Sequence, residues 1–215
     1  CQAGQIDIGR FSLDNVSVLS LNIGQPEDLL QSARMYASAG VLSIETEKPH
    51  FENERNSAFR VQMRGGSFGY VSPSIRWWQK AGSRTSFSLN GNYMRADGNY
   101  PFTLVNGKYV TEEKRNNSAI YTYQIEPTLF HTFKDSSNLE LKAYYFYSKR
   151  GLPGSVTLYN PISDETLWDE NVFIQTRYKK DFSQKWSLQA QAKYNHGWNK
   201  YEDKGNEYAD GLYRA

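Results

Sequence analysis

The residues that most often perform acid–base or metal chemistry are few and widely separated in this chain. The three histidines are His50, His131 and His196, and they fall in different segments. Cys1 is the only cysteine, which rules out a disulfide framework or a multi-cysteine metal site within the chain. No His-Asp-Ser order, HExxH motif, P-loop or GxGxxG motif occurs. We therefore expect no catalytic residues and no enzyme.

Carboxylates are concentrated in two segments. They are Asp164, Glu165, Asp169 and Glu170 in a predicted loop of mixed charge, and Glu202, Asp203, Glu207 and Asp210 near the C-terminus. Oxygen ligands of this kind bind calcium, but their spacing matches no defined calcium-binding loop. The sequence predicts solvated loops with no metal site and no cofactor, and calcium in the outer loops is the alternative.

Aromatic residues between the predicted strands are better candidates for binding. The chain has 16 Tyr, 11 Phe and 5 Trp, and its segments 98–117 and 151–170 combine aromatic and apolar residues with turn residues. Asn106-Gly107 predicts a small hairpin in the first of them. Exposed rings on a concave surface bind large amphipathic ligands, although packing between loops accounts for these rings equally well. The candidate binding residues here are Tyr100, Phe102, Tyr109, Tyr159 and Trp168.

Long strands must hold these segments in place. Period-two alternation of apolar and polar residues predicts seven strands after residue 57. They lie near 58–65, 70–78, 86–93, 119–133, 139–147, 171–178 and 186–195. Each is about ten residues or longer, which is enough to cross a bilayer at a tilt.

The alternation separates two kinds of face. Leu188, Ala190 and Ala192 share one face of the last strand, and Gln189, Gln191 and Lys193 alternate with them on the other. Apolar residues capped by Tyr or Trp suit contact with lipid, and the polar face suits a hydrated lumen. A soluble antiparallel sheet also has one wet face, so it is the competing interpretation.

The lengths of the connections favour a membrane barrel. Short polar segments at 80–84, 134–138 and 183–185 alternate with long ones at 98–117, 151–170 and from 198 onward. The tight turn Gly65–Gly69 is the exception. Transmembrane barrels have short periplasmic turns and long outer loops. The fold class we predict is all-β with a small α/β plug portion, followed by a partial transmembrane antiparallel β-barrel of about seven strands.

The first 49 residues differ from the rest. Val16, Val18, Leu19 and Leu21 predict one buried strand, and residues 41–44 predict another. Between them, Pro26 followed by two acids suits the start of a helix. The predicted division is a plug portion at 1–49, a linker at 50–57 and barrel strands at 58–215. We interpret the chain, which begins with Cys1 rather than Met, as a fragment.

Two motifs resemble the plug of TonB-dependent outer-membrane receptors. Residues 15–26, which read NVSVLSLNIGQP, resemble the plug strand and turn of that family, and residues 37–49, which read ASAGVLSIETEKP, resemble the element that ends the plug. The chain departs from the family pattern at Ser17 or Ser20 in place of Glu and at Ile23 in place of Arg. These departures resemble the Bacteroidetes branch, and some resemble its cobalamin receptors.

The resemblance implies a complete barrel of about 22 strands around a plug. It also implies energised uptake driven by TonB-ExbB-ExbD, location in the outer membrane, contact with its lipid, and for some members a capping surface lipoprotein. Cobalamin or another corrinoid is the first substrate expected, an iron–siderophore complex the second and a glycan the third. The plug residues implied to touch substrate are Gln2, Gln5, Met35, Tyr36 and Ser38.

Two other classes of protein stay open. A passive porin-like barrel would lack a plug, and a soluble β-sandwich would be a binding module. The mean hydropathy of −0.72 excludes a bundle of membrane helices. The net charge of +2 gives no reason to expect a nucleic-acid partner.

Overall fold

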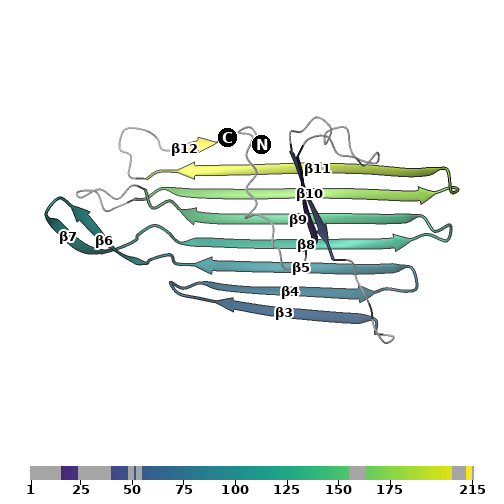
Figure 1. Cartoon of the computed structure of the whole chain (residues 1–215), viewed down its shortest axis with the longest axis horizontal. Coiled ribbons are helices and arrows are strands. Elements are labelled where there is room, and N and C mark those ends of the chain that lie inside the picture. Colours follow the sequence, from purple (N-terminus) through teal and green to yellow (C-terminus); the bar gives the residue numbers. More distant parts are fainter. Residues whose placement is uncertain are drawn as a thin grey trace.

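One large antiparallel sheet dominates the structure (Figure 1). The computed structural model describes residues 16–23, 40–47, 51, 55–154, 163–204 and 212–214. Within these residues the sheet has eight strands in the order β12–β11–β10–β9–β8–β5–β4–β3. They are β3 (Ser57–Gly65), β4 (Val71–Lys80), β5 (Thr85–Ala96), β8 (Ile120–Thr132), β9 (Asn138–Gly151), β10 (Thr166–Asp181), β11 (Ser187–Glu202) and β12 (Leu212–Arg214). The antiparallel all-β prediction is confirmed, and β3 and β12 are the two edges of an open sheet.

Two separate hairpins accompany the main sheet. β1 (Val16–Ile23) pairs with β2 (Gly40–Thr46), and β6 (Pro101–Asn106) pairs with β7 (Tyr109–Lys114). Gly107 in the β6–β7 turn has a φ of 61°, a conformation that glycine adopts at little cost. The hairpin predicted from Asn106-Gly107 is therefore confirmed, and it projects beyond the sheet (Figure 1).

The connections of the main sheet divide by length between its two ends. The short ones at 81–84, 133–137 and 182–186 lie at one end, and 97–119 and the described ends of the next connection, 152–154 and 163–165, lie at the other (Figure 1). The short turn 66–70 also lies at this second end and is the exception. The segment 97–119 contains the β6–β7 hairpin. The alternation of short and long connections predicted from the sequence is confirmed from β4 to β11, and the β6–β7 hairpin lies at the long-connection end. The long segment predicted from 198 onward is wrong at its start, because β11 continues to Glu202.

Strands β9, β10 and β11 are longer than predicted, with 14, 16 and 16 residues. The predicted loop 151–170 is wrong at its second half, because Trp168, Asp169 and Glu170 lie in β10. Glu202 likewise ends β11. Asp169 pairs with Ser148 on one side and with Asn199 on the other, so the ladder satisfies the backbone on both sides. A strand continues through polar residues when its backbone N–H and C=O groups still form hydrogen bonds with the strands on both sides.

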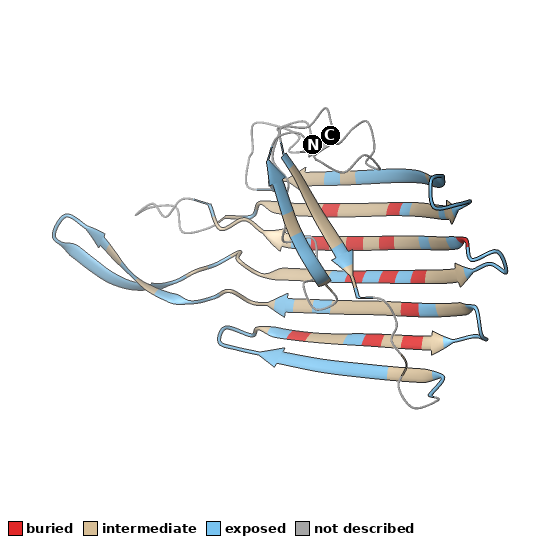
Figure 2. Ribbon diagram, turned by 45° about the vertical axis from the view of Figure 1, so that its right-hand side comes forward, coloured by how far each residue is buried: buried red, intermediate tan, exposed pale blue. Residues whose placement is uncertain are grey.

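Buried residues alternate with more exposed ones along β8 and β9 (Figure 2), and the apolar face of the sheet is the exposed one. Exposed residues on it are Phe59, Val61, Met63, Val71, Ile75, Phe87, Tyr93, Tyr123, Ile125, Leu141, Ile174, Leu188 and Tyr194. The opposite face, which we call the polar face, holds most of the buried polar residues: Ser72, Arg76, Ser88, Gln124, Glu126, Thr128, Ser148 and Asp169. The predicted separation of faces is confirmed. A soluble sheet normally buries the apolar side, so this burial is inverted.

The small buried core lies on the polar face. Tyr144, Phe146 and Phe173 form it, and the rings of Tyr144 and Phe173 stack with centroids 4.6 Å apart. Tyr144 and Phe173 are directly opposite each other in the β9–β10 register. The sequence predicted polar residues along this face, and the aromatic stack within it was not predicted.

The β1–β2 hairpin is more exposed than predicted. Val18, Leu19 and Leu21 are exposed by 48%, 51% and 64%, so the prediction of a buried first strand is wrong for them. A two-stranded sheet has no second layer of its own to cover both faces. The predicted helix after Pro26 lies outside the described residues, and the described part of the chain is free of helix. It accordingly holds no helix with the length and apolarity needed to cross a membrane.

The turn between β8 and β9 is fixed by a charged side chain. Asp135 accepts hydrogen bonds from Lys180 Nζ at 2.7 Å, from Ser137 Oγ at 2.7 Å and from the Ser137 N–H at 3.2 Å. These bonds, led by the one from Lys180, hold the pKa of Asp135 well below its usual range. A lowered pKa means that ionised Asp135 stabilises this turn above the ordinary carboxyl pKa and that the contribution is lost in strong acid.

Candidate functional site

The β1–β2 hairpin lies across the polar face of the main sheet (Figure 2). Hydrogen bonds and ion pairs from β2 and from Glu47 reach strands β3, β4 and β9. The hairpin and this face therefore bring Glu47, Arg76, Glu126 and Lys142 close to their common interface. We take this interface as the candidate functional site.

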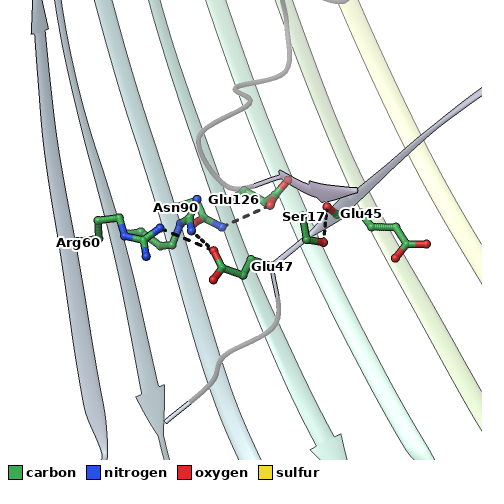
Figure 3. Close-up of polar contacts among 7 residues, drawn as sticks. Ser17, Glu45, Glu47, Arg60, Asn90 and Glu126 are labelled. Carbon is green, nitrogen blue, oxygen red and sulfur yellow. Dashed lines mark hydrogen bonds and ion pairs between the residues drawn. The ribbon is translucent and has the colours of Figure 1, made fainter. Parts of the chain in front are cut away.

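Glu47 forms the first ionic contact between hairpin and sheet. Its carboxylate accepts a short hydrogen bond from Arg76 Nη1 and lies 3.8 Å from Arg60 Nη1 (Figure 3). The guanidinium groups of Arg60 and Arg76 lie 5.7 and 5.2 Å from the centroid of the Trp78 ring. The Arg76 side chain is only 6% exposed, so its charge needs a partner in a partly desolvated place. Glu47 supplies that partner from the end of the hairpin.

A second ionic contact lies deeper on the polar face. Lys142 Nζ donates a hydrogen bond to Thr46 Oγ1 at 2.9 Å and lies 3.8 Å from Glu126 Oε1. Asn90 Nδ2 lies 3.5 Å from the same carboxylate oxygen (Figure 3). The Lys142 and Glu126 side chains are 12% and 7% exposed. This pair joins β8, β9 and the hairpin in one network.

A cavity of about 330 Å³ lies between the hairpin and strands β8 to β11. Its lining includes Ile44 from the hairpin, Phe173 and Arg177 from β10, and Lys193 from β11. Lys193 Nζ lies 4.0 Å from the centroid of the Phe173 ring, and Arg177 Nη2 lies 3.6 Å from Glu140 Oε2. A polar cavity with charges of both signs suits water and polar solutes better than an apolar ligand.

An aromatic cluster marks the long-connection end of the sheet. Tyr100 packs edge-on against Phe68 and Phe102, with ring centroids 6.1 and 6.4 Å apart. The Phe68 carbonyl accepts hydrogen bonds from the N–H groups of Asp97 at 2.9 Å and Gly98 at 3.2 Å. The turn after β3 is thereby joined to the base of the β6–β7 hairpin.

Two long connections are tied to each other. Asn117 Nδ2 donates to the carbonyls of Leu152 at 3.0 Å and Glu165 at 2.7 Å, and Arg115 Nη2 donates to the Gly154 carbonyl at 2.6 Å. Both donors follow the β6–β7 hairpin, and the acceptors belong to the next long connection. These bonds tie the segment after the hairpin to the described ends of the next connection, and loops held by a rigid scaffold are where binding residues often lie.

The predicted binding residues fall in three places. Tyr100 and Phe102 lie together in the cluster, whereas Tyr109 is 72% exposed near the hairpin tip and apart from them. Trp168 lies in β10 on the apolar face, so its prediction as a loop residue is wrong. The other predicted residues lie outside the described part of the chain: Gln2, Gln5, Met35, Tyr36, Ser38 and Tyr159.

The charged residues under the hairpin were not picked out from the sequence. Arg76 stands between Ile75 and Trp77, and Lys142 stands between Leu141 and Ala143. The sequence feature that could have identified them is a charged residue in the middle of a long strand of alternating apolar and polar residues. Such a charge must either face water or have a partner of opposite charge. Glu47 gave no such signal, because its partners come from strands that follow it in the chain.

Comparison with known proteins adds no assignment. No family model matches the chain, and no curated protein matches it. Among the described residues, no three His, Cys, Asp or Glu side chains are grouped so that they could hold a metal ion.

The Lys142–Glu126 pair yields a testable prediction. Lys142→Met should leave the Glu126 carboxylate without its ammonium partner and lower the free energy of unfolding of the complete protein by about 3 kcal/mol. Glu126→Gln combined with Lys142→Met should recover most of this loss, because no buried charge is left unpaired. Urea unfolding followed by tryptophan fluorescence measures both.

Thr46→Val is the matched control, because it removes one hydrogen-bond acceptor from Lys142 and leaves the ion pair. It should cost about 1 kcal/mol. Equal losses for Lys142→Met and Thr46→Val would show that the ion pair contributes nothing beyond that hydrogen bond.

Proposed function

We propose that the chain is part of a TonB-dependent outer-membrane receptor that takes up a large, scarce nutrient. The observation that carries this proposal is the inverted burial of the main sheet. Its apolar face is exposed, and the middle of its polar face is buried, in part beneath the β1–β2 hairpin. Water is a poor solvent for so large an apolar surface, whereas lipid is a good one.

The dimensions of the apolar face support the same proposal. Tyr123 in β8 and Phe133, the first residue after β8, are ten residues apart, which is about 33 Å along an extended chain. At a tilt of about 40° this corresponds to a height of about 25 Å, the apolar band of outer-membrane barrels. Aromatic side chains occur at both ends of the band, with Tyr123 and Tyr147 stacked at 4.8 Å at one end and Phe133 edge-on to Tyr178 at 6.3 Å at the other.

The hairpin supports a plug rather than an empty pore. Its residues 40–47 belong to the motif that resembles the end of the family's plug, and β2 and Glu47 bond to the face that would line the lumen. A passive porin-like barrel offers no reason for a separate hairpin bonded to its lumen. In the proposed receptor, residues 1–49 belong to the plug and residues 58–215 form the first part of the barrel.

Cobalamin or another corrinoid is the proposed substrate, with an iron–siderophore complex or a glycan as alternatives. This choice follows the family resemblance of residues 15–49. The aromatic cluster of Phe68, Tyr100 and Phe102, at the end that would face the exterior, gives such a ligand a surface for stacking. The TonB-ExbB-ExbD complex would supply the energy, and a surface lipoprotein is an expected additional partner.

A growth experiment tests the proposed function. Cells that lack the complete protein should fail to grow on limiting cobalamin, and cells that lack TonB should show the same defect. Growth restored by free cobalamin at high concentration would be consistent with a lost high-affinity path. A defect on ferric siderophore alone would select the second substrate, and TonB-independent uptake would favour a passive pore.

The orientation of the sheet gives a second prediction. In the proposed receptor the chain passes from the plug into β3 on the periplasmic side of the membrane. Each strand then crosses the membrane once, which places the long connections outside the cell and the short turns in the periplasm. An epitope tag inserted after Gly107 of the complete protein should be labelled by antibody on intact cells, and a tag after Ser136 should not. The reverse labelling pattern would invert the topology and remove the receptor proposal.

The two faces of β11 give a third prediction. Ala190 shares the exposed apolar face with Leu188, while Gln191 shares the polar face with Lys193, which lines the cavity. A basic residue at the bilayer midplane costs about 2–4 kcal/mol, so Ala190→Arg should impair barrel assembly and Gln191→Arg should not. The shift in gel mobility between unheated and heated samples reports assembly, and equal shifts for the two variants would contradict the assignment of the faces.

A further inference from the structure

A row of alternating basic and aromatic residues crosses the apolar face at the long-connection end of the sheet. In the strand register Arg95 on β5 is opposite Tyr121 on β8, and Tyr121 is opposite Lys149 on β9. Lys149 is opposite Trp168 on β10, and Trp168 is opposite Lys200 on β11. The five strands are adjacent in the sheet (Figure 1). The row is therefore continuous, although its members are far apart in the sequence.

The basic side chains of this row lie against the rings beside them. The guanidinium of Arg95 is 5.6 Å from the centroid of the Tyr121 ring. Lys149 Nζ and Lys200 Nζ are 5.6 and 4.5 Å from the centroid of the Trp168 ring. Attraction between a cation and a ring face keeps the side chain extended along the surface instead of out in water. Two ammonium groups, from the strands on either side of β10, thus converge on one indole.

The row lies at the boundary of the apolar face. Two residues farther into the sheet, Tyr93, Tyr123 and Tyr147 follow one another across three strands. Rings of this kind occupy the headgroup level of a membrane. The basic row is one step farther from the apolar band, which is where the charged parts of lipid headgroups lie.

Three carboxylates lie near the three basic residues of the row. Arg95 pairs with Asp97 at 3.1 Å and Lys200 with Glu202 at 3.4 Å, and both carboxylates lie two residues farther toward the connections. Glu170 lies one pair inward, between Tyr147 and Trp198 in the register. Lys149 is exposed and has no ion-pair partner among the described residues. An anion that approaches from the membrane side passes Glu170 first, and then meets Lys149 and Lys200 before it meets Asp97 or Glu202.

We propose that Lys149, Trp168 and Lys200 form a binding site for the phosphate group of an anionic lipid in the outer leaflet. The inference rests on the proposed function, because it needs the apolar face to contact lipid. Lysine binds phosphate as a compact charge with rotatable donors, and the two ammonium groups lie 5.6 and 4.5 Å from the centroid of the Trp168 ring, so a phosphate beside this ring is within reach of both. Acyl chains below that phosphate would lie on the apolar face beyond Tyr147.

The test measures lipid binding by the complete protein in neutral detergent, with native mass spectrometry as the readout. The probes are lipid A that carries a phosphate monoester, phosphatidylcholine and sodium phosphate. The double variant Lys149→Gln with Lys200→Gln should bind lipid A at least about tenfold more weakly, since each removed charge weakens attraction to an anionic headgroup. Its binding of phosphatidylcholine should be unchanged, and the loss should shrink as salt is raised.

The matched control removes the same charge elsewhere. Lys108→Gln with Lys114→Gln changes two exposed lysines on the β6–β7 hairpin, and lipid A binding should change by less than about twofold. Equal losses in the two double variants would show that only the total charge matters. Unchanged lipid A binding by the Lys149→Gln, Lys200→Gln variant would show that these two lysines have a structural role only. Sodium phosphate that binds as tightly as lipid A would identify a free-anion site. Each of these results overturns the lipid site.

Failure of the lipid site can be told apart from failure of the proposed function. Membrane fractionation and heat-dependent gel mobility of the unmodified protein are measured first. A protein that is absent from the outer membrane removes the proposed function and the lipid site together. A protein that is assembled there, with lipid A binding that does not depend on Lys149 and Lys200, removes the lipid site alone.

Discussion

Strict alternation of side chains along paired strands is the constraint on which the rest of this structure depends. Because successive side chains point to opposite faces, the continuous register from β3 to β11 puts the paired charges Arg76, Glu126 and Lys142 on one side and most of the aliphatic residues on the other. The ladder also pairs the backbone polar groups across the whole width of the sheet. The two faces are therefore chemically different surfaces, and each needs a different neighbour.

The polar face finds its neighbour in the β1–β2 hairpin. Arg76 and Glu126 are among its buried charges, and each has a partner of opposite sign: Glu47 for Arg76 and Lys142 for Glu126. Charges in a partly desolvated place are retained only when they are paired, so the network specifies how the hairpin sits against the sheet. In the proposed receptor the same contacts would hold a plug that must later move. Ionic contacts suit that purpose better than a large apolar interface, since water can replace them when the hairpin separates.

The apolar face has no protein neighbour among the described residues. The surface changes in composition from the middle of this face toward the long-connection end: apolar residues come first, then an aromatic border, and then the basic row. A bilayer has the same gradation from acyl chains through the interface to the headgroups. The proposed membrane location and the proposed lipid site are two consequences of that one gradation.

The sequence by itself determined the strands, their faces and the alternation of connection lengths, because period-two alternation and turn residues are local properties. Leu188 and Gln189 show their opposite faces from spacing alone, and Asn106-Gly107 shows its hairpin. Only the tertiary structure decided which distant residues meet. Glu47, before the linker, forms ion pairs with Arg60 and Arg76, which follow the linker. Trp168, which was predicted to lie in a loop, lies in β10 between Lys149 and Lys200. Strand length and register depend on backbone pairing with neighbouring strands, and that pairing leaves no mark in the local sequence of any one of them.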